Sequence, residues 1–442
     1  VNLKILLSGP LRRGALSPAD RDTLLAEMTE DVAAHVLKDN YDQTLALSVA
    51  ELRAAKDLDA DGRFMRDLER RGKLDRAVEF LPDDEALRNR AKENKALTRP
   101  ELAVLLAYAK LDLDAEINDS ELPDDPFFEA DLAGYFPPAA AQKFPDAVEH
   151  HRLRREIIAT VLSNRIVNLA GPVLIHRMKE ITGAPGWQAA RAVVVANGTF
   201  GLSALKARID ALDGKVHAQA QVSMYADLAD LLRRQGVWFM ANIAADADLE
   251  PTIALYRGGV EALRGTFSTL ISEYDARDIE ARIAELRAAN VPLDVAEDVA
   301  VLPLMAAAPE ITMLAHAKTL PIDLVAGAYF AAGEAAGLDR LRGLAARIAS
   351  PEHWDRLAIR RMVDDLYSGQ RALTAEALGT LGTAPPAANR HDGAKAVAAW
   401  AEARAEHLTR ARNFLNELER GGELSIAKLT LANSQIQQLA AR

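Results

Sequence analysis

Apolar residues recur every three or four positions along nearly the whole chain, which is the spacing of amphipathic α-helices. Three stripes show this pattern most clearly: Leu153, Ile157, Ile158, Val161 and Leu162; Tyr225, Leu228, Ala229 and Leu232; and Val397, Trp400, Ala401, Leu408, Ala411, Leu415 and Leu418. Only residues 3–7 and 193–195 form aliphatic runs typical of strands, and both lie inside a helical pattern. The sequence therefore predicts an all-α protein, a multi-helix bundle assembly with no substantial β-sheet.

Helix boundaries are marked by capping residues. A start is predicted where a hydroxyl side chain precedes a proline of the first turn, and a stop where glycine follows the apolar pattern. Starts of this kind are expected at Ser17, Thr98 and Ser350, and stops at Gly72, Gly214, Gly337 and Gly421–Gly422.

Three segments interrupt the helical pattern. Residues 112–148 hold prolines at 123, 126, 137, 138 and 145, so we expect a long ordered segment that crosses the molecule. Residues 182–186 predict a tight turn, and residues 383–393 (TAPPAANRHDG) have the composition of a linker. The absence of a repeat of fixed period argues against a solenoid.

Charge and composition narrow the range of partners. The net charge of −11, from 64 acidic and 53 basic residues, argues against a nucleic-acid partner, which requires a basic surface. The same charge and the lack of a long apolar run argue against a membrane partner. With no cysteine there is no sign of a disulfide-stabilised secreted protein. We therefore expect a cytoplasmic protein.

Residues 57–62 (DLDADG) imitate the start of a calcium-binding EF-hand loop. Such a loop needs a bidentate carboxylate at its twelfth position, which is Leu68 here, while Glu69 is one residue late. We therefore predict an acidic turn that ends a helix, in preference to a calcium site.

Residues 150–156 (HHRLRRE) form the densest basic cluster. On a helix, His151, Arg154 and Arg155 would share one side while Leu153 and Ile157 face the core. This side could dock an acidic surface or a phosphate. A solvated face paired with neighbouring acids is the favoured interpretation.

Asn164 and Asn168 lie four residues apart, with His176 following Pro172. Amides at this spacing can line a ligand pocket or bridge helices. We favour a structural hydrogen-bond network, because buried polar groups are usually satisfied by neighbouring chain.

Common catalytic patterns are missing from the sequence. No histidine has glutamate three residues before it, and no His-Glu-x-x-His motif exists, so no metal site is predicted. Residues 201–205 (GLSAL) lack the closing glycine of a nucleophile elbow. Glycine-rich nucleotide loops are also absent. A site assembled from distant residues remains open.

Two long motifs resemble one enzyme family. Residues 97–110 (LTRPELAVLLAYAK) and 151–160 (HRLRREIIAT), continuing through Asn164 and Asn168, are similar to hallmarks of the large bacterial NAD-specific glutamate dehydrogenases. Shorter matches follow the same order: residues 31–48, 80–82, 135–137, 238–239 and 364–371. The resemblance covers nearly the whole chain, although residues after 383 match only in general character.

The resemblance implies where this chain lies in such an enzyme. The family carries regulatory domains, then a catalytic pair of domains, then a helical C-terminal region, which this chain resembles. Together with the three interruptions, it predicts four parts: residues 1–50 as closing helices of the upstream catalytic domain, 51–185 as a helical subdomain that includes the 112–148 crossing segment, 186–383 as a helical bundle, and 384–442 as a linker and C-terminal helices. A chain that starts at Val1 instead of methionine fits the expectation of a fragment.

The resemblance also implies a function. The parent enzyme would convert L-glutamate, NAD and water to 2-oxoglutarate, ammonium and NADH. Its catalytic and NAD-binding residues would lie upstream, so we predict no catalytic, cofactor-binding or metal-binding residue and no cofactor in this chain, and no activity for it alone. Its partners would be its own catalytic domains and the other subunits of a homo-oligomer, in a structural, oligomerisation or regulatory role. Two alternatives stay open: an independent helical interaction module that uses residues 150–155, and an enzyme with a dispersed site.

Overall fold

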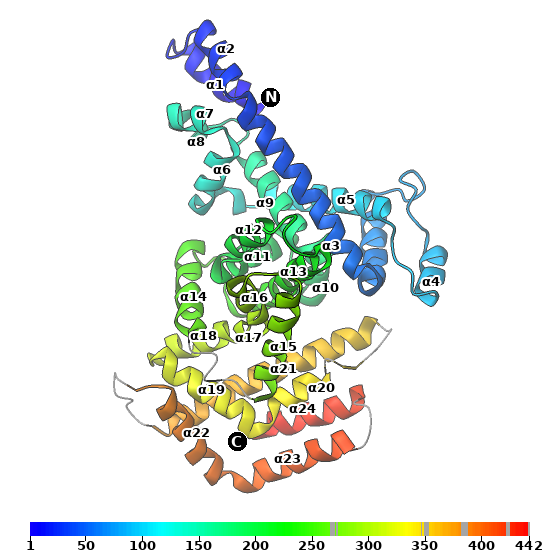
Figure 1. The fold of residues 1–442 in the computed structure, drawn as a ribbon, viewed down its shortest axis with the longest axis vertical. Coiled ribbons are helices and arrows are strands. Elements are labelled where there is room, and N and C mark those ends of the chain that lie inside the picture. The colour runs from blue at the N-terminus through cyan, green and yellow to red at the C-terminus, as the bar shows by residue number, and fades with distance from the viewer. Residues whose placement is uncertain are drawn as a thin grey trace. The chain divides into compact units, whose positions relative to one another are not determined.

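The computed structural model describes residues 1–265, 270, 273–345, 347–348, 353–381, 388–420 and 425–440. Every regular element in these ranges is a helix, and none of the described residues forms a strand, which confirms the all-α prediction (Figure 1). The aliphatic runs at 3–7 and 193–195 lie inside helices α1 and α11.

The described chain divides into two compact units. Unit 1 comprises residues 1–252 and 288–295, and unit 2 comprises residues 253–287 and 296–442. The chain passes from one unit to the other within α14 (Leu249–Arg264), at the end of α15 (Glu273–Ala288) and within α16 (Leu293–Ala300).

Unit 1 is built mainly from longer helices that pack in pairs. Helix α11 packs against α13, α5 against α9, and α3 against α5, α9 and α13. Its helices are α1 (Asn2–Arg12), α2 (Pro18–Glu27), α3 (Thr29–Arg70), α4 (Asp84–Lys92), α5 (Arg99–Asn118), η1 (Leu122–Asp124), η2 (Pro126–Phe128), α6 (Glu129–Tyr135), α7 (Pro138–Lys143), α8 (Pro145–Glu149), α9 (Arg154–Ala170), α10 (Leu174–Thr182), α11 (Gly186–Phe200), α12 (Leu202–Asp210) and α13 (Ala218–Asn242).

Helix α3 is the longest element of unit 1 and has two different halves. Its 42 residues span about 63 Å at 1.5 Å per residue. The second half is buried through residues such as Phe64, Met65 and Leu68, whereas every residue from 32 to 40 is exposed. Figure 1 shows α1 and α2 beside the first half of α3, at the end of this long helix.

The predicted boundaries at Ser17, Thr98 and Gly72 are confirmed, whereas α12 already ends at Asp210, before the predicted stop at Gly214. Ser17 accepts a hydrogen bond from the Asp20 amide at 3.1 Å, and Thr98 and Glu101 form a reciprocal capping box at the start of α5. Gly72 follows the end of α3 with a φ of 68°, and Gly183 ends α10 with a φ of 71°, inside the predicted turn at 182–186. Both backbones occupy the left-handed region that glycine adopts without a steric penalty.

The crossing segment predicted at 112–148 is more helical than expected. Its first seven residues continue α5 to Asn118, and the rest consists of short helices η1 to α8. Pro123, Pro126, Pro138 and Pro145 each occupy the first turn of one of these helices. Proline starts helices well because its fixed φ suits the first turn and its missing amide hydrogen is not needed there.

Unit 2 is arranged around α19. This helix packs against α22, α21 and α18, and α21 packs against α24. Besides the parts of α14, α15 and α16, unit 2 contains α17 (Leu302–Met305), α18 (Ala308–Lys318), α19 (Ile322–Ala336), α20 (Leu338–Ala345), α21 (His353–Gly379), α22 (Arg390–Ala403), α23 (Ala405–Arg420) and α24 (Ile426–Ala440). Gly337 ends α19 with a φ of 69°, as predicted.

The linker prediction for residues 383–393 is wrong at its C-terminal end. Helix α22 already begins at Arg390, where Asn389 and Asp392 form a capping box. Asn389 and Asp392 satisfy free amides at the start of the helix, so α22 begins at Arg390, four residues after Pro386. Residues 382–387 lie outside the described residues, as do the predicted boundaries at Ser350 and Gly421–Gly422.

No single helix in the described ranges combines the length and apolar character needed to cross a bilayer. Two bent pairs of consecutive helices meet the length and composition requirement together: Arg154–Ala170 with Leu174–Thr182, and Leu293–Ala300 with Leu302–Lys318.

Candidate functional site

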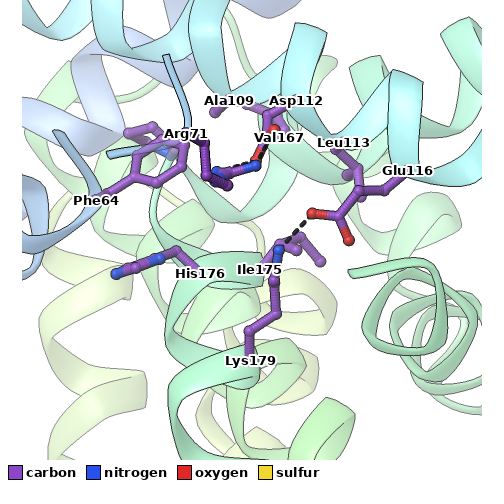
Figure 2. Close-up of a pocket in the computed structure, with 11 residues that line it drawn as sticks. Phe64, Arg71, Ala109, Asp112, Leu113, Glu116, Val167, Ile175, His176 and Lys179 are labelled. Carbon is purple, nitrogen blue, oxygen red and sulfur yellow. Dashed lines mark hydrogen bonds and ion pairs between the residues drawn. The ribbon is translucent and has the colours of Figure 1, made fainter. Parts of the chain in front are cut away.

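A polar cluster lies in unit 1 where α3, α5, α9 and α10 meet (Figure 2). Arg71 at the end of α3 reaches Asp112 on α5 and donates two hydrogen bonds, at 2.6 and 2.8 Å. Lys73 donates a third to the same carboxylate at 2.5 Å. The Asp112 side chain is only 9% exposed, so the cluster holds a nearly buried carboxylate between two cations.

The electrostatics of this cluster indicate a stable ion pair. Burial would raise the pKa of Asp112, but the hydrogen bonds from Arg71 and Lys73 outweigh it and hold the pKa below its usual value. The hydrogen bonds that Arg71 donates to Asp112 raise the pKa of Arg71 in turn. Both partners therefore stay charged over the whole physiological pH range, which suits a structural cross-link and not a proton-transfer group.

The rest of the cluster joins further helices. Lys179 on α10 pairs with Glu116 on α5, and Glu116 also accepts a hydrogen bond from the Gly186 amide at the start of α11, at 2.6 Å. The cavity between these side chains measures about 10 Å³, which is room for at most one water molecule. The cluster thus connects four helices and leaves no space for a substrate.

The acidic segment 57–62 is not a turn, which corrects the prediction. It lies inside α3, where Asp57 pairs with Arg177 of α10 at 2.8 Å and with Arg53 at 3.4 Å. Arg53 also pairs with Asp230 of α13 at 2.6 Å. Asp57 and Arg53 thus tie α3 to α10 and α13 by ion pairs along this segment, and the helix continues past Gly62 to Arg70.

Asp61 in this segment is buried without a charged partner. Its side chain is 1% exposed, and Oδ2 has no hydrogen-bond partner among the described residues. Burial, aided by the charge of Asp57, raises the pKa of the Asp61 carboxyl well above its ordinary value, although Arg177 and Arg63 act in the opposite direction. The folded protein therefore favours the protonated, neutral form of the Asp61 side chain.

We expect Asp61→Asn to stabilise the protein at pH 8 by about 1 kcal/mol or more. A carboxyl with a raised folded pKa contributes fully below its unfolded pKa, and that contribution is lost as the pH rises through the folded pKa. Asparagine cannot ionise, and a neighbouring cavity of about 20 Å³ has room for one water to bond its amide. Urea unfolding at pH 4 and pH 8 measures the effect. Lower stability of the variant at pH 8 would contradict the assignment.

The basic cluster 150–156 is held by internal contacts. Arg154 and Arg155 both pair with Asp124, and Arg155 also donates to the carbonyl oxygens of Asn118 and Ser120, at 2.8 and 2.7 Å. These contacts confirm the pairing with neighbouring acids. They also satisfy carbonyl groups at the end of α5.

His151 does not share a side with the two arginines, which corrects the prediction. It precedes α9, is 5% exposed, and its ring lies 5.2 Å from that of Phe136. Its Nε2 lies 3.2 Å from the carbonyl oxygen of Asn2. The helix begins only at Arg154, so helical spacing does not apply to residue 151.

The predicted asparagine network is incomplete. Asn168 Oδ1 is buried and has no hydrogen-bond partner in the described chain. His176 Nε2 lies 3.3 Å from Glu180 Oε1, an ion-pair distance for a protonated ring, but the contact lacks hydrogen-bond geometry. The His176 ring also lies 5.2 Å from Phe64. Phe64 and His176 thus form a packing contact between α3 and α10.

A second titratable cluster joins α3, α12 and α13. Tyr225 donates to Asp210 at 2.6 Å, and Lys206 bonds Asp210 and Asp42, each at 2.9 Å. Burial, together with the bond to Asp210, raises the pKa of Tyr225. Because each charge has a partner within the cluster, it is an ion-pair network and not an activated catalytic group.

Neither a metal-ligand cluster nor the strand-to-helix turn of a dinucleotide site is found among the described residues. In the ranges that the structure describes, no group of three or more histidine, aspartate or glutamate side chains is placed to hold a metal. A dinucleotide is bound where a strand turns into a helix, and no described residue is in a strand. The prediction that this chain carries no site residue stays a prediction.

The cluster of Figure 2 was not predicted, although the sequence carries a signal for it. Asp112 and Glu116 stand on the stripe of α5 that continues from Leu105 and Ala109, three or four residues apart. An acid on an apolar stripe points into the core and needs a partner there. The identity of that partner depends on which helices meet, which a stripe does not indicate.

Comparison with known proteins gives consistent matches. The family model described as glutamate dehydrogenase, C-terminal, matches residues 94–438, and that described as bacterial NAD-glutamate dehydrogenase, catalytic domain, matches residues 1–50. Three similar proteins are each named NAD-specific glutamate dehydrogenase. That of Halomonas elongata is 34% identical over 440 residues, covering 100% of this chain and 27% of the relative. That of Pseudomonas aeruginosa is 35% identical over 452 residues, with coverage of 100% and 27%, and that of Mycobacterium tuberculosis is 29% identical over 439 residues, with coverage of 99% and 26%. The chain thus spans about a quarter of the length of these relatives.

Proposed function

Because the chain belongs to the glutamate dehydrogenase C-terminal family, we propose that it is the helical, non-catalytic part of an NAD-specific glutamate dehydrogenase. The parent enzyme would oxidise L-glutamate with NAD and water to 2-oxoglutarate, ammonium and NADH. One observation carries the proposal: a catalytic-domain match ends at residue 50, and the C-terminal family match occupies residues 94–438 of the same chain.

The proposed role is to pack against the catalytic domain and against other subunits. The charged clusters support a structural role and not a catalytic one, because their acidic side chains pair with basic side chains of the same chain. Exposed apolar side chains also support it: Val32, Val36 and Leu37 are 39%, 53% and 67% exposed on α3, inside the segment that matches the catalytic domain. An apolar stripe of this kind on a helix is normally buried against another part of the protein. We propose that the catalytic domain of the same enzyme packs on it.

Ligand titration tests the non-catalytic assignment. We expect neither NAD nor L-glutamate to bind the 442-residue chain with micromolar affinity in isothermal titration calorimetry, and no NADH to form when both are supplied. The physical reason is that the described residues lack the strand-to-helix turn that cradles a dinucleotide. Micromolar binding of either compound, or turnover, would overturn the assignment.

A paired substitution tests the structural role. Val36→Glu with Leu37→Glu should change the melting temperature of the isolated chain little, because both side chains are exposed in it. In the full-length enzyme the same pair should lower the melting temperature by several degrees, since it would bury two charges at an interface. Ala34→Glu, at an exposed position of the same helix that points away from Val36, is the matched control. Equal small effects in both proteins would contradict the packing role.

A further inference from the structure

A separate cavity of unit 1 lies between α11 and the C-terminal end of α13. Its volume is about 130 Å³, and its lining includes Thr182 and Ala184 before α11 and Ile243 and Ala245 after α13. A cavity of about 150 Å³ in a protein core accommodates benzene, so this one has room for roughly six non-hydrogen atoms. It is therefore far larger than the spaces beside Asp112 and Asp61.

One wall of the cavity carries a buried cation. Arg191 on α11 is 8% exposed. Its Nη1 donates one long hydrogen bond of 3.4 Å to the carbonyl oxygen of Ala244, and its Nη2 meets no hydrogen-bond partner in the described part of the chain. Burial lowers the pKa of the Arg191 guanidinium, and the carboxylates of Asp125, Asp246 and Asp248 oppose this only from a distance. A buried guanidinium without a paired anion lowers the stability of the folded protein.

The remaining walls are mostly apolar. Val195, Phe239, Met240 and Ile243 face the same space, and Gln188 is one of its few polar side chains. A ligand that fits must therefore have one anionic end for Arg191 and a small hydrocarbon body. Guanidinium and carboxylate match in geometry, because two parallel N–H groups can bond two oxygens.

We propose that this cavity binds a short-chain aliphatic carboxylate of about six non-hydrogen atoms, with its carboxylate paired to Arg191 and its hydrocarbon chain against Val195, Phe239 and Ile243. The ligand exchanges the weak bond to Ala244 for a charged pair. Because Nη2 is covered from solvent, a direct pair with the ligand requires a small movement of the guanidinium toward the cavity. The inference does not depend on the proposed function.

Sodium butyrate, which has six non-hydrogen atoms, is the probe. We expect saturable binding to the 442-residue chain with a millimolar dissociation constant, measured by ligand-observed NMR and isothermal titration calorimetry. Butyramide has the same size without the charge and should bind about 10-fold more weakly or not at all. Equal binding of the two compounds, or no saturable binding of butyrate, would overturn the proposal.

Three variants locate the site. Ala192→Leu fills the cavity and leaves Arg191 in place, and Arg191→Met removes the charge at similar volume; both should abolish butyrate binding. Arg152→Met, at an exposed position, should leave it unchanged. Circular dichroism checks that each variant is folded, and Ala192→Leu keeps the test decisive if Arg191→Met does not fold. Unchanged binding in a folded Ala192→Leu variant would place butyrate elsewhere and refute the assignment.

Discussion

Gly393→Ala is expected to lower the free energy of unfolding of unit 2 by about 3 kcal/mol. A Cβ atom at this position of α22 would lie 2.1 Å from the carbonyl oxygen of Leu324 and 2.8 Å from the amide nitrogen of Ala328, both on α19. The contact is reciprocal, since a Cβ at Gly327 would lie 2.1 Å from the carbonyl oxygen of Arg390. Backbone atoms cannot rotate out of the way as a side chain does, so the two helices must separate.

Denaturant unfolding and hydrogen exchange of the α22 amides measure this effect. Trp400 on α22 is 3% exposed and reports on the same packing by fluorescence. Gly258→Ala is the control, because a Cβ at that position of α14 meets no described atom within 4 Å. It should stabilise by about 0.5–1 kcal/mol, as alanine does in an open helix. A Gly393→Ala protein as stable as the control would show that α19 and α22 are not in backbone contact.

Asp112→Asn is expected to cost about 2–3 kcal/mol of stability. The substitution leaves Arg71 and Lys73 facing a neutral amide in a nearly buried position. Breaking a fully buried pair costs about 3–5 kcal/mol, and the partial exposure of the two cations reduces this. Thermal and urea unfolding at pH 7 measure the loss. Asp119→Asn, at an exposed position just after α5, should change stability by less than about 0.5 kcal/mol.

The pH dependence gives a second check on Asp112. Because the cations lower its folded pKa, its contribution is fully present above the ordinary value of 3.8 and is lost as the pH falls through the lower, folded pKa. The difference between wild type and Asp112→Asn should therefore be constant from pH 5 to 8 and shrink below pH 4. A difference that persists unchanged in acid would mean that packing, and not charge, is what the substitution removes.

The sequence predicted a helix boundary correctly where the residues that determine it are adjacent in the chain. The hydroxyl caps at Ser17 and Thr98 and the glycine stops at Gly72 and Gly337 depend on a few adjacent residues, and the structure places them as expected. Asn389 and Asp392 are a local signal of the same kind, and their capping box starts α22 inside a segment whose composition is typical of a linker.

The misjudged residues are those whose environment is made by distant segments. Residues 57–62 resemble an acidic turn in isolation, but Arg177 and Asp230, more than a hundred residues away, complete an ion-pair network that keeps them helical. His151 belongs by sequence to a basic cluster, yet the packing of Phe136 and the carbonyl oxygen of Asn2 bury it.

Periodicity and capping alone were therefore enough to establish an all-α chain and the helix boundaries at Ser17, Thr98, Gly72 and Gly337, because both act over one or two turns. Which charges pair, which glycines let α19 and α22 touch, and where Arg191 is left facing an open cavity were decided only by tertiary packing. These features arise from contacts between helices far apart in the chain, and one amphipathic stripe is compatible with many neighbours.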